Sequence, residues 1–172
     1  MTLIDGLLQE LEEEARTTRR LLERVPNDRL AWRPHGKARS LGELALHVAQ
    51  VPGGVAQLAA TPSPAQAPQF TDSSPGSAAE LIPALEGSIA TARQVLAGMD
   101  DAELTADWCL MAGDRELFTI QRAAFLRSIM LNHWYHHRGQ LTAYLRQLDV
   151  PIPSIYGPSA DENPFAQGPV AT

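Results

Sequence analysis

The stretch TIQRAAFLRSIMLNHWYHHRGQLTAYLRQL, residues 119–148, decides how this chain folds. Apolar and aromatic side chains recur in it every three or four residues, which places them along one face of a helix. That face also carries two histidines, and its members are Ala123, Leu126, Met130, His133, His137, Leu141, Tyr144 and Leu148. About eight turns pass without an internal proline. The spacing therefore predicts one long helix over residues 119–148.

Two more helices are predicted on the N-terminal side. The first covers residues 3–25 and ends before Pro26, with an apolar stripe of Leu3, Leu7, Leu8, Leu11, Ala15, Thr18, Leu22 and Val25. The second begins at Ser40, because Ser40 and Glu43 form the pattern of a capping box. Its apolar face consists of Leu41, Leu44, His47, Val48 and Val51. The sequence PGG at residues 52–54 is expected to end or kink this helix, with a further turn over residues 55–60.

A third helix is predicted over residues 77–99. Ser77 and Glu80 form a second capping box, Pro83 lies where it could kink the start, and the apolar stripe is Leu81, Leu85, Ile89, Ala92 and Leu96. Together with residues 119–148 this makes four helices long enough to bury one shared core. The sequence therefore predicts an all-α four-helix bundle.

The connecting segments have the composition of loops. Residues 27–39 are polar and interrupted by Pro34, and we expect the indole ring of Trp32 to fix them to the domain. Residues 61–76 are rich in proline and serine and are expected to form a surface loop without a regular element. Gly113 and Asp114 separate two short segments, which indicates a small hairpin. From about residue 149 the chain is expected to form an irregular proline-rich tail, anchored by Ile152, Ile155, Tyr156 and Phe165.

Size and charge limit the classes of function. A chain of 172 residues can bury one sizeable core, so we expect a single domain over residues 1–172. With 14 basic and 20 acidic residues the net charge is −6, and we therefore expect no nucleic-acid partner. Cys109 is the single cysteine and has no partner for an intramolecular disulfide, and the acidic N-terminus lacks the pattern of a secretory signal. No apolar run is long enough to cross a bilayer. We expect a cytoplasmic protein without a membrane segment.

Three of the five histidines fall on faces that otherwise consist of core residues. His47 lies on the second predicted helix, and His133 and His137 lie four residues apart on the last. Residues at that spacing are about 5–6 Å apart on one face, which allows two imidazoles to bind one ion at about 2.0–2.1 Å. A shared metal would also satisfy three buried imidazoles at once. His136 points in another direction around the helix, and His35 lies in a connector.

The same pattern leaves alternatives open. The two-histidine helix of metalloproteases needs a glutamate directly after the first histidine, and Trp134 occupies that position, so we do not expect peptide hydrolysis by that route. Three neutral histidines leave one coordination position open, as in reactive sites, where water, hydroxide or a thiolate would bind. The metal-free alternative is a bundle whose histidines form hydrogen bonds with buried carboxylates or carbonyls.

Three stretches carry a resemblance to a known family. SLGELALH at residues 40–47, NHWYHHRGQL at residues 132–141 and PSIYGPSADE at residues 153–162 resemble, in the same order, the DinB/YfiT-like family of metalloenzymes. The resemblance covers nearly the whole chain. It implies an up-down-down-up four-helix bundle, commonly a homodimer, with nickel, zinc or a similar ion on three histidines. The matching positions here are His47, His133 and His137.

The resemblance is less informative about the reaction. Some members transfer or isomerise substrates with a low-molecular-weight thiol such as mycothiol or bacillithiol, which the metal would hold as the nucleophilic thiolate. Many members have no known activity. Two functions therefore remain open: a divalent-metal-dependent enzyme, in particular a thiol-dependent S-transferase or isomerase, and a non-catalytic metal-binding dimer associated with stress. The substrate and the catalytic residues beyond a metal-bound water or thiol are not indicated.

Several neighbours of the histidines have two interpretations each. Glu43 lies one turn before His47 and would either support a metal ligand or serve only as a helix cap. Gln140 would orient a bound water, and Arg138 is expected to form an ion pair or an interface contact. Cys109 is expected to be a small buried residue rather than a nucleophile. Trp32, Trp134 and Tyr144 are assigned to packing, and Tyr156 to a cover over the mouth of the pocket.

Overall fold

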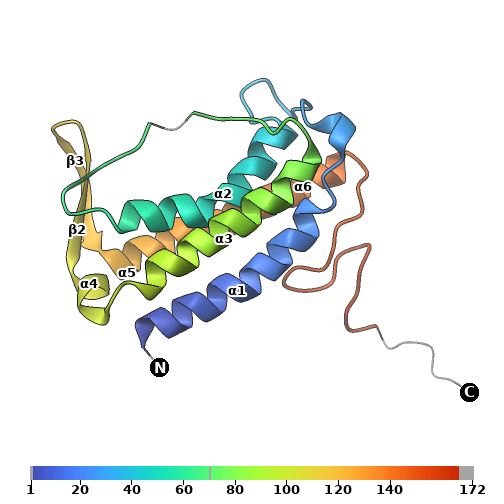
Figure 1. Cartoon of the computed structure of the whole chain (residues 1–172). Helices are drawn as coiled ribbons and strands as arrows, with labels where there is room; N and C mark the ends of the chain where they lie inside the picture. The colour runs from blue at the N-terminus through green and yellow to red at the C-terminus, as the bar shows by residue number, and fades with distance from the viewer. Residues whose placement is uncertain (1, 70, 167–172) are drawn as a thin grey trace, which may run out of the picture.

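Four long helices form the bundle in a computed structural model that describes residues 2–69 and 71–166. They are α1 (Leu3–Leu22), α2 (Leu41–Ala59), α3 (Leu81–Ala97) and α6 (His133–Gln147). In Figure 1, α2 and α3 run back against the direction of α1, and α6 runs with it. The long connection between α2 and α3 makes this possible, because it returns the chain to the end from which α2 started (Figure 1). The up-down-down-up bundle is confirmed.

The helix starts were set by local sequence. Ser40 Oγ accepts the backbone N–H of Glu43 while the Glu43 carboxylate accepts the N–H of Ser40, so the capping box predicted for α2 is confirmed. A second one at Ser77 and Glu80 opens the short 3-10 helix η2 (Ala78–Glu80), which leads directly into α3. The connector before α2 contains another short 3-10 helix, η1 (Asn27–Arg29). Side-chain oxygens thus accept from backbone N–H groups that have no partner within the helix at both helix starts.

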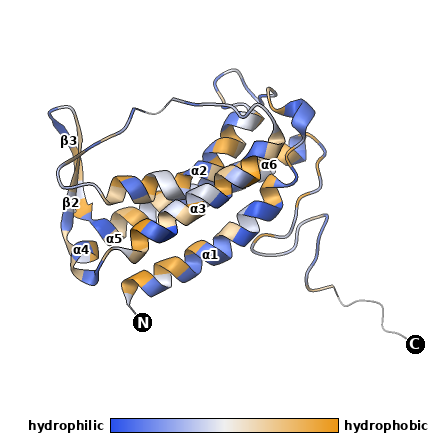
Figure 2. Cartoon of the chain, viewed as in Figure 1, coloured by the Kyte–Doolittle hydropathy of each residue, from blue (hydrophilic) through white to orange (hydrophobic). Residues whose placement is uncertain are grey.

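A single apolar core lies between the helices. Leucines dominate it, including Leu11, Leu21, Leu44, Leu81 and Leu141, each fully buried. Hydrophobic residues recur along each long helix between hydrophilic ones, as Figure 2 shows. No helix within the described ranges is long and apolar enough to cross a membrane.

Helix α2 continues through Pro52, where the sequence predicted an end or a kink. A proline has no N–H, so the carbonyl of Val48 one turn earlier loses its helical donor. The indole Nε1–H of Trp134 donates to this carbonyl at 2.8 Å. Directly after Pro52, the N–H of Gly53 donates to Ser88 Oγ at 2.8 Å, and a Cβ at Gly53 would lie 2.7 Å from the Ser88 carbonyl oxygen. Contacts from neighbouring helices therefore hold α2 helical to Ala59.

The last helical segment starts later and is less regular than predicted. Residues 119–121 belong to strand β3 (Arg115–Gln121), and helical structure begins with α5 (Arg122–Phe125). A π-helical stretch, η3 (Leu126–Asn132), then joins α5 to α6. Each π turn closes over one more residue than an α turn, and such insertions are frequent at functional sites. Here the stretch ends directly before His133.

A small sheet closes one end of the bundle. The predicted hairpin is confirmed: β2 (Asp107–Ala112) pairs antiparallel with β3 through a turn in which Gly113 has φ +60°. Residues 61–76 contain one regular element after all, because β1 (Ala65–Gln66) pairs parallel with β2. The short helix α4 (Asp101–Thr105) connects α3 to this sheet. The sheet edge beside β2 supplied a template for backbone hydrogen bonds that composition could not indicate.

The tail has no helix or strand over residues 149–166, as predicted. Pro153 and Ser154 are buried, whereas the predicted anchor Phe165 is exposed. Ile152 and Ile155 pack against the core as expected. Pro169, the last proline of the predicted tail, lies outside the described residues.

Candidate metal centre

Three histidines from two helices converge between α2 and α6. One imidazole nitrogen from each of His47, His133 and His137 lies within 4.8 Å of the other two. The Nε2 atoms of His47 and His133 are 3.3 Å apart. The sequence predicted these three residues as a group, and the fold brings them together.

The distances fit one tetrahedral ion. Two nitrogens that each lie about 2.0–2.1 Å from such an ion are about 3.3 Å apart, which is the separation between His47 and His133. The three rings are nearly perpendicular to one another, with interplanar angles of 84°, 86° and 87°. Rings in this arrangement do not stack face to face. The donor set therefore fits a divalent transition metal.

The environment keeps the imidazoles neutral. Burial, together with the positive charge of Arg39, lowers the pKa of His47 to about 4. Burial also lowers the pKa of His137 to about 4 and that of His133 below its ordinary value. Neutral imidazole is the form that binds a metal, so all three side chains are ready for coordination near pH 7.

Gln140 supports one ligand directly. Its Oε1 lies 3.0 Å from Nδ1 of His137, so the amide oxygen accepts from Nδ1–H and leaves Nε2 unprotonated. Partners of this kind fix the tautomer and orientation of a metal-binding histidine. His137 is only 8% exposed, whereas His47 and His133 are half-buried. Gln140 was predicted to orient a water, and in the structure it orients His137.

Other candidates lie outside the cluster. The carboxylate of Glu43 accepts from Ser40 and forms an ion pair with Arg33 at 2.7 Å, so it acts as a helix cap with no contact to His47. His136 is exposed, as predicted, and His35 lies in the connector. Cys109 is partly exposed in β2, with its sulfur next to that of Met111.

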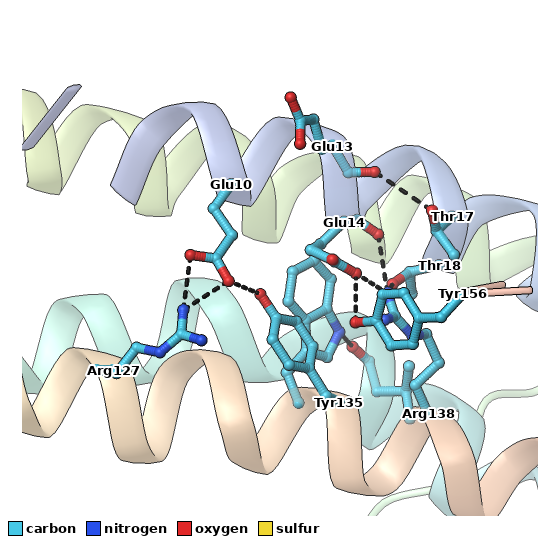
Figure 3. Close-up of polar contacts among 11 residues, drawn as sticks. Glu10, Glu13, Glu14, Thr17, Thr18, Arg127, Tyr135, Arg138 and Tyr156 are labelled. Atoms are coloured by element: carbon cyan, nitrogen blue, oxygen red, sulfur yellow. Dashed lines mark hydrogen bonds and ion pairs between the residues drawn. The ribbon is translucent and has the colours of Figure 1, made fainter. Parts of the chain in front are cut away.

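Arg138 and Tyr156 belong to a second polar group on the opposite side of α6. Arg138 is 1% exposed and forms an ion pair with Glu14 of α1. The Tyr156 hydroxyl accepts from Arg138 and donates to Glu14 at 3.0 Å, and the rings of Tyr135 and Tyr156 lie 5.1 and 5.0 Å from the guanidinium carbon. Figure 3 shows this group between α1 and α6. Arg138 forms the expected ion pair, and Tyr156 covers that pair, not the histidines.

Two residues near the histidines were missed as functional candidates. Tyr144 was assigned to packing, and its ring does contact Trp32 at 5.6 Å, but its buried hydroxyl has no hydrogen-bond partner in the described part of the chain. Arg39 was not singled out, although its charge lowers the pKa of all three histidines. The sequence signal for Tyr144 was its position on the histidine stripe, seven residues after His137.

Two surface cavities lie away from the histidines. One of about 260 Å³ is a groove between α1 and α3 that Arg16, Arg19 and Glu86 help to line. The other, of about 360 Å³, lies near Gln94 and Arg122. Ion pairs between Arg19 and Glu86 already span the first groove, and neither cavity brings together a metal-binding set.

Comparisons with known proteins agree with this architecture. The profile of the DinB family matches residues 2–166. The solved structure of a DinB-like protein from Bacillus cereus ATCC 10987 superimposes with a TM-score of 0.65 at 23% identity, over 88% of this chain and 97% of that one. A DinB-like protein from Bacillus subtilis gives 0.62 at 19% identity over 84% and 92% of the two chains, and a DinB-family protein from Exiguobacterium sibiricum 255-15 gives 0.59 at 23% over 87% and 93%.

A shorter match adds a relative of undefined function. The uncharacterized protein YrdA of Bacillus subtilis strain 168 is 43% identical over 37 residues, a span of 22% of each chain. At the identities of the three solved structures, the likeness is one of fold. Chemical evidence must therefore come from the residues of this chain.

Proposed function

Because this chain belongs to the DinB family, we propose that His47, His133 and His137 bind one divalent transition metal ion. The observation that carries this proposal is the 3.3 Å separation of the Nε2 atoms of His47 and His133, with the third imidazole beside them. The metal-free alternative calls for carboxylate or carbonyl partners on the histidines. Over residues 2–69 and 71–166, the hydrogen bonds of these rings are to one another and to the side-chain amide of Gln140, and none is to a carboxylate.

We further propose that the protein is a metal-dependent enzyme acting on a low-molecular-weight thiol or on water. When bound, the ion supplies the positive charge that keeps a thiol or water deprotonated at neutral pH. The histidines contribute no negative charge to offset it. Gln140 holds Nδ1–H of His137, which keeps the proton away from the nitrogen that faces the ion. A thiol-dependent S-transferase or isomerase is the reaction class that this arrangement supports best.

A non-catalytic metal-binding dimer is the second candidate. It would use the ion only to join α2 to α6. Structural sites are closed, whereas catalytic sites keep a reachable position. His47 and His133 are half-buried, so each residue is partly accessible to solvent. This exposure favours a reactive site over a closed one.

Elemental analysis of the purified, untagged protein tests the proposal. The wild type is compared with a His133→Ala/His137→Ala double variant purified in the same way. We expect near-stoichiometric metal in the wild type, with nickel or zinc favoured, and little in the variant. Equal or absent metal in both, even after incubation with nickel and zinc, would overturn the metal site.

A second assay separates the two candidates. The metal-loaded protein is titrated with a small thiol, and thiol transfer to an electrophilic acceptor is followed with and without the ion. Metal-dependent transfer supports the enzyme, whereas bound metal without thiol binding supports the structural role. A homodimer stays a prediction, to be tested by sedimentation of the same preparations.

A further inference from the structure

The helices that carry the histidines also bring Tyr144 and the start of α2, where Arg39 and Ser40 lie, to one end of the site. His47 and His137 face each other across α2 and α6. Tyr144 lies seven residues, or about two turns, after His137, and Ser40 lies seven residues before His47. Because α2 and α6 run in opposite directions, both steps lead to the same end of the bundle (Figure 1). The contact between Tyr144 and Trp32, whose carbonyl accepts from the N–H of Leu41, places this end at the start of α2.

Tyr144 presents a buried donor that the fold does not use. The residue is 4% exposed, and its hydroxyl is the single buried side-chain polar atom without a hydrogen-bond partner among the described residues. Side chains on a helix lean toward its N-terminus, so this hydroxyl leans toward the turn that carries Gln140 and His137. Burial raises the pKa of Tyr144, which keeps the hydroxyl protonated and able to donate. An unused buried donor is costly unless a ligand satisfies it.

Arg39 supplies a positive charge at the same end. Its Nε donates to Asp72 at 2.8 Å, and its terminal nitrogens have no hydrogen-bond partner within residues 2–69 and 71–166. Its positive charge acts to lower the pKa of all three histidines and of Tyr144. The loop that carries Asp72 packs closely on α2, since a Cβ at Gly42 would lie 2.6 Å from Ser74 Oγ. The Asp72 contact therefore holds the guanidinium at the start of α2, about two turns before His47, with its terminal nitrogens available as donors.

We propose that the ligand of this site carries a carboxylate, which accepts hydrogen bonds from the Tyr144 hydroxyl and the Arg39 guanidinium while its other end reaches the ion. This inference rests on the proposed metal site and names its substrate class. Arginine and a neutral hydroxyl donor together match the two oxygens of a carboxylate. The net charge of the protein is −6, which disfavours the binding of anions over most of its surface. A local positive charge at Arg39 would therefore direct an anionic ligand to this site.

The test compares a thiol that carries a carboxylate with one that does not. The protein is loaded with Co²⁺ and titrated with 3-mercaptopropionate or 3-mercaptopropanol, and the thiolate–cobalt absorption band gives each Kd. In the wild type we expect the carboxylate to bind about tenfold more tightly, the effect of one or two charge-assisted hydrogen bonds. Arg39→Gln should bring the two Kd values together, and Tyr144→Phe should reduce their ratio severalfold. Arg115→Gln, which removes the same charge on the distant hairpin, should leave the ratio unchanged.

Contrary outcomes are distinguishable. Equal Kd values in the wild type, or a ratio that survives both substitutions, would overturn the carboxylate site and leave the metal site standing. Failure to bind cobalt would instead overturn the proposed function. In that case propionate is titrated into the metal-free protein, and the NMR signal of the Trp32 indole N–H reports on the neighbouring Tyr144. A saturating shift that Arg39→Gln abolishes would support the carboxylate site, and the absence of any shift would overturn it.

Discussion

The two sides of α6 differ in how their buried polar groups are paired. Toward α1, the buried Arg138 has a carboxylate, two hydroxyls and two aromatic rings around it. Toward α2, His133 and His137 cluster with His47, and the Tyr144 hydroxyl has no hydrogen-bond partner in the described chain. One side contains charged groups that are fully compensated, and the other contains neutral groups that are not.

This difference distinguishes buried polar groups that stabilise the fold from buried polar groups that are available to a ligand. Buried polar groups are almost always satisfied in folded proteins, so a satisfied network needs no ligand to explain it. Three histidines whose ring nitrogens lie close enough to share one ion, next to an unused hydroxyl, form a site that can fold but is incomplete by itself. We therefore expect substitutions on the α1 side to act on stability alone, and those on the α2 side to act on stability through the ligand.

The largest effect is expected from removing one metal ligand. At a free metal concentration of a thousand times Kd, binding stabilises the folded protein by about 4 kcal/mol. His47→Ala should lose most of this, because two histidines bind far more weakly than three. Urea unfolding with saturating zinc measures the loss.

The control is urea unfolding of the same His47→Ala variant in the presence of a metal chelator. Without metal, His47→Ala should change the free energy of unfolding little. Removing all three histidines should cost hardly more than removing one when metal is present, since one substitution already abolishes binding. A triple variant that loses the sum of three separate losses would show that the histidines act independently.

The second largest effect is expected on the other side of α6. Glu14→Ala leaves the guanidinium of Arg138 buried without its carboxylate, which should destabilise the protein by about 3 kcal/mol. Glu13→Ala removes the same group from an exposed position of α1 and should have little effect. Urea unfolding compares the two variants. Metal content per folded molecule should stay at the wild-type value in both.

A double variant sharpens this result. Glu14→Ala/Arg138→Met removes both charges and should recover much of the lost stability, because the penalty comes from the unpaired charge. If Glu14→Ala alone also removed the metal, the two sides of α6 would be coupled, and the separation drawn above would be wrong.

A third prediction concerns the helix that carries His47. Trp134→Phe removes the indole donor to the Val48 carbonyl and leaves a small cavity, which should cost about 2 kcal/mol. Trp108→Phe is the matched control. Its indole donates to the Thr61 carbonyl, but Arg122 also donates there, so that carbonyl stays satisfied. Thermal unfolding should show the larger loss for Trp134→Phe, and metal affinity should fall only in that variant.

The parts of this molecule that sequence could predict depend on local spacing. The capping box of Ser40 and Glu43 lies within four residues, and His133 and His137 are joined by one helical turn. His47 could be added because its stripe was apolar on either side. These features survive in the fold because nearby residues on one element meet in a fixed geometry.

What could not be predicted depends on distant partners. Helix α2 continues past Pro52 with support from Trp134, 86 residues beyond Val48, which donates to the carbonyl that the proline leaves without its helical donor. Glu14 lies 124 residues before Arg138, so the sequence could only leave an ion pair and an interface contact as alternatives. The π-helical stretch before His133 has no composition that would separate it from an α-helix. The missing partner of Tyr144 is likewise a property of the folded structure alone.

The smallest expected effect has the opposite sign. Tyr144→Phe removes a buried hydroxyl that the structure gives no partner, so the ligand-free protein should become more stable by about 1 kcal/mol or less. Thermal unfolding in a chelator measures this gain, and Tyr135→Phe is the control, because its hydroxyl donates to Glu10 at 2.8 Å and its loss should destabilise. A stabilising change that also weakens carboxylate binding is the combination expected of a residue kept for its ligand. If Tyr144→Phe destabilised the protein as Tyr135→Phe does, its hydroxyl would have a structural partner, and Tyr144 would belong with the compensated side of α6.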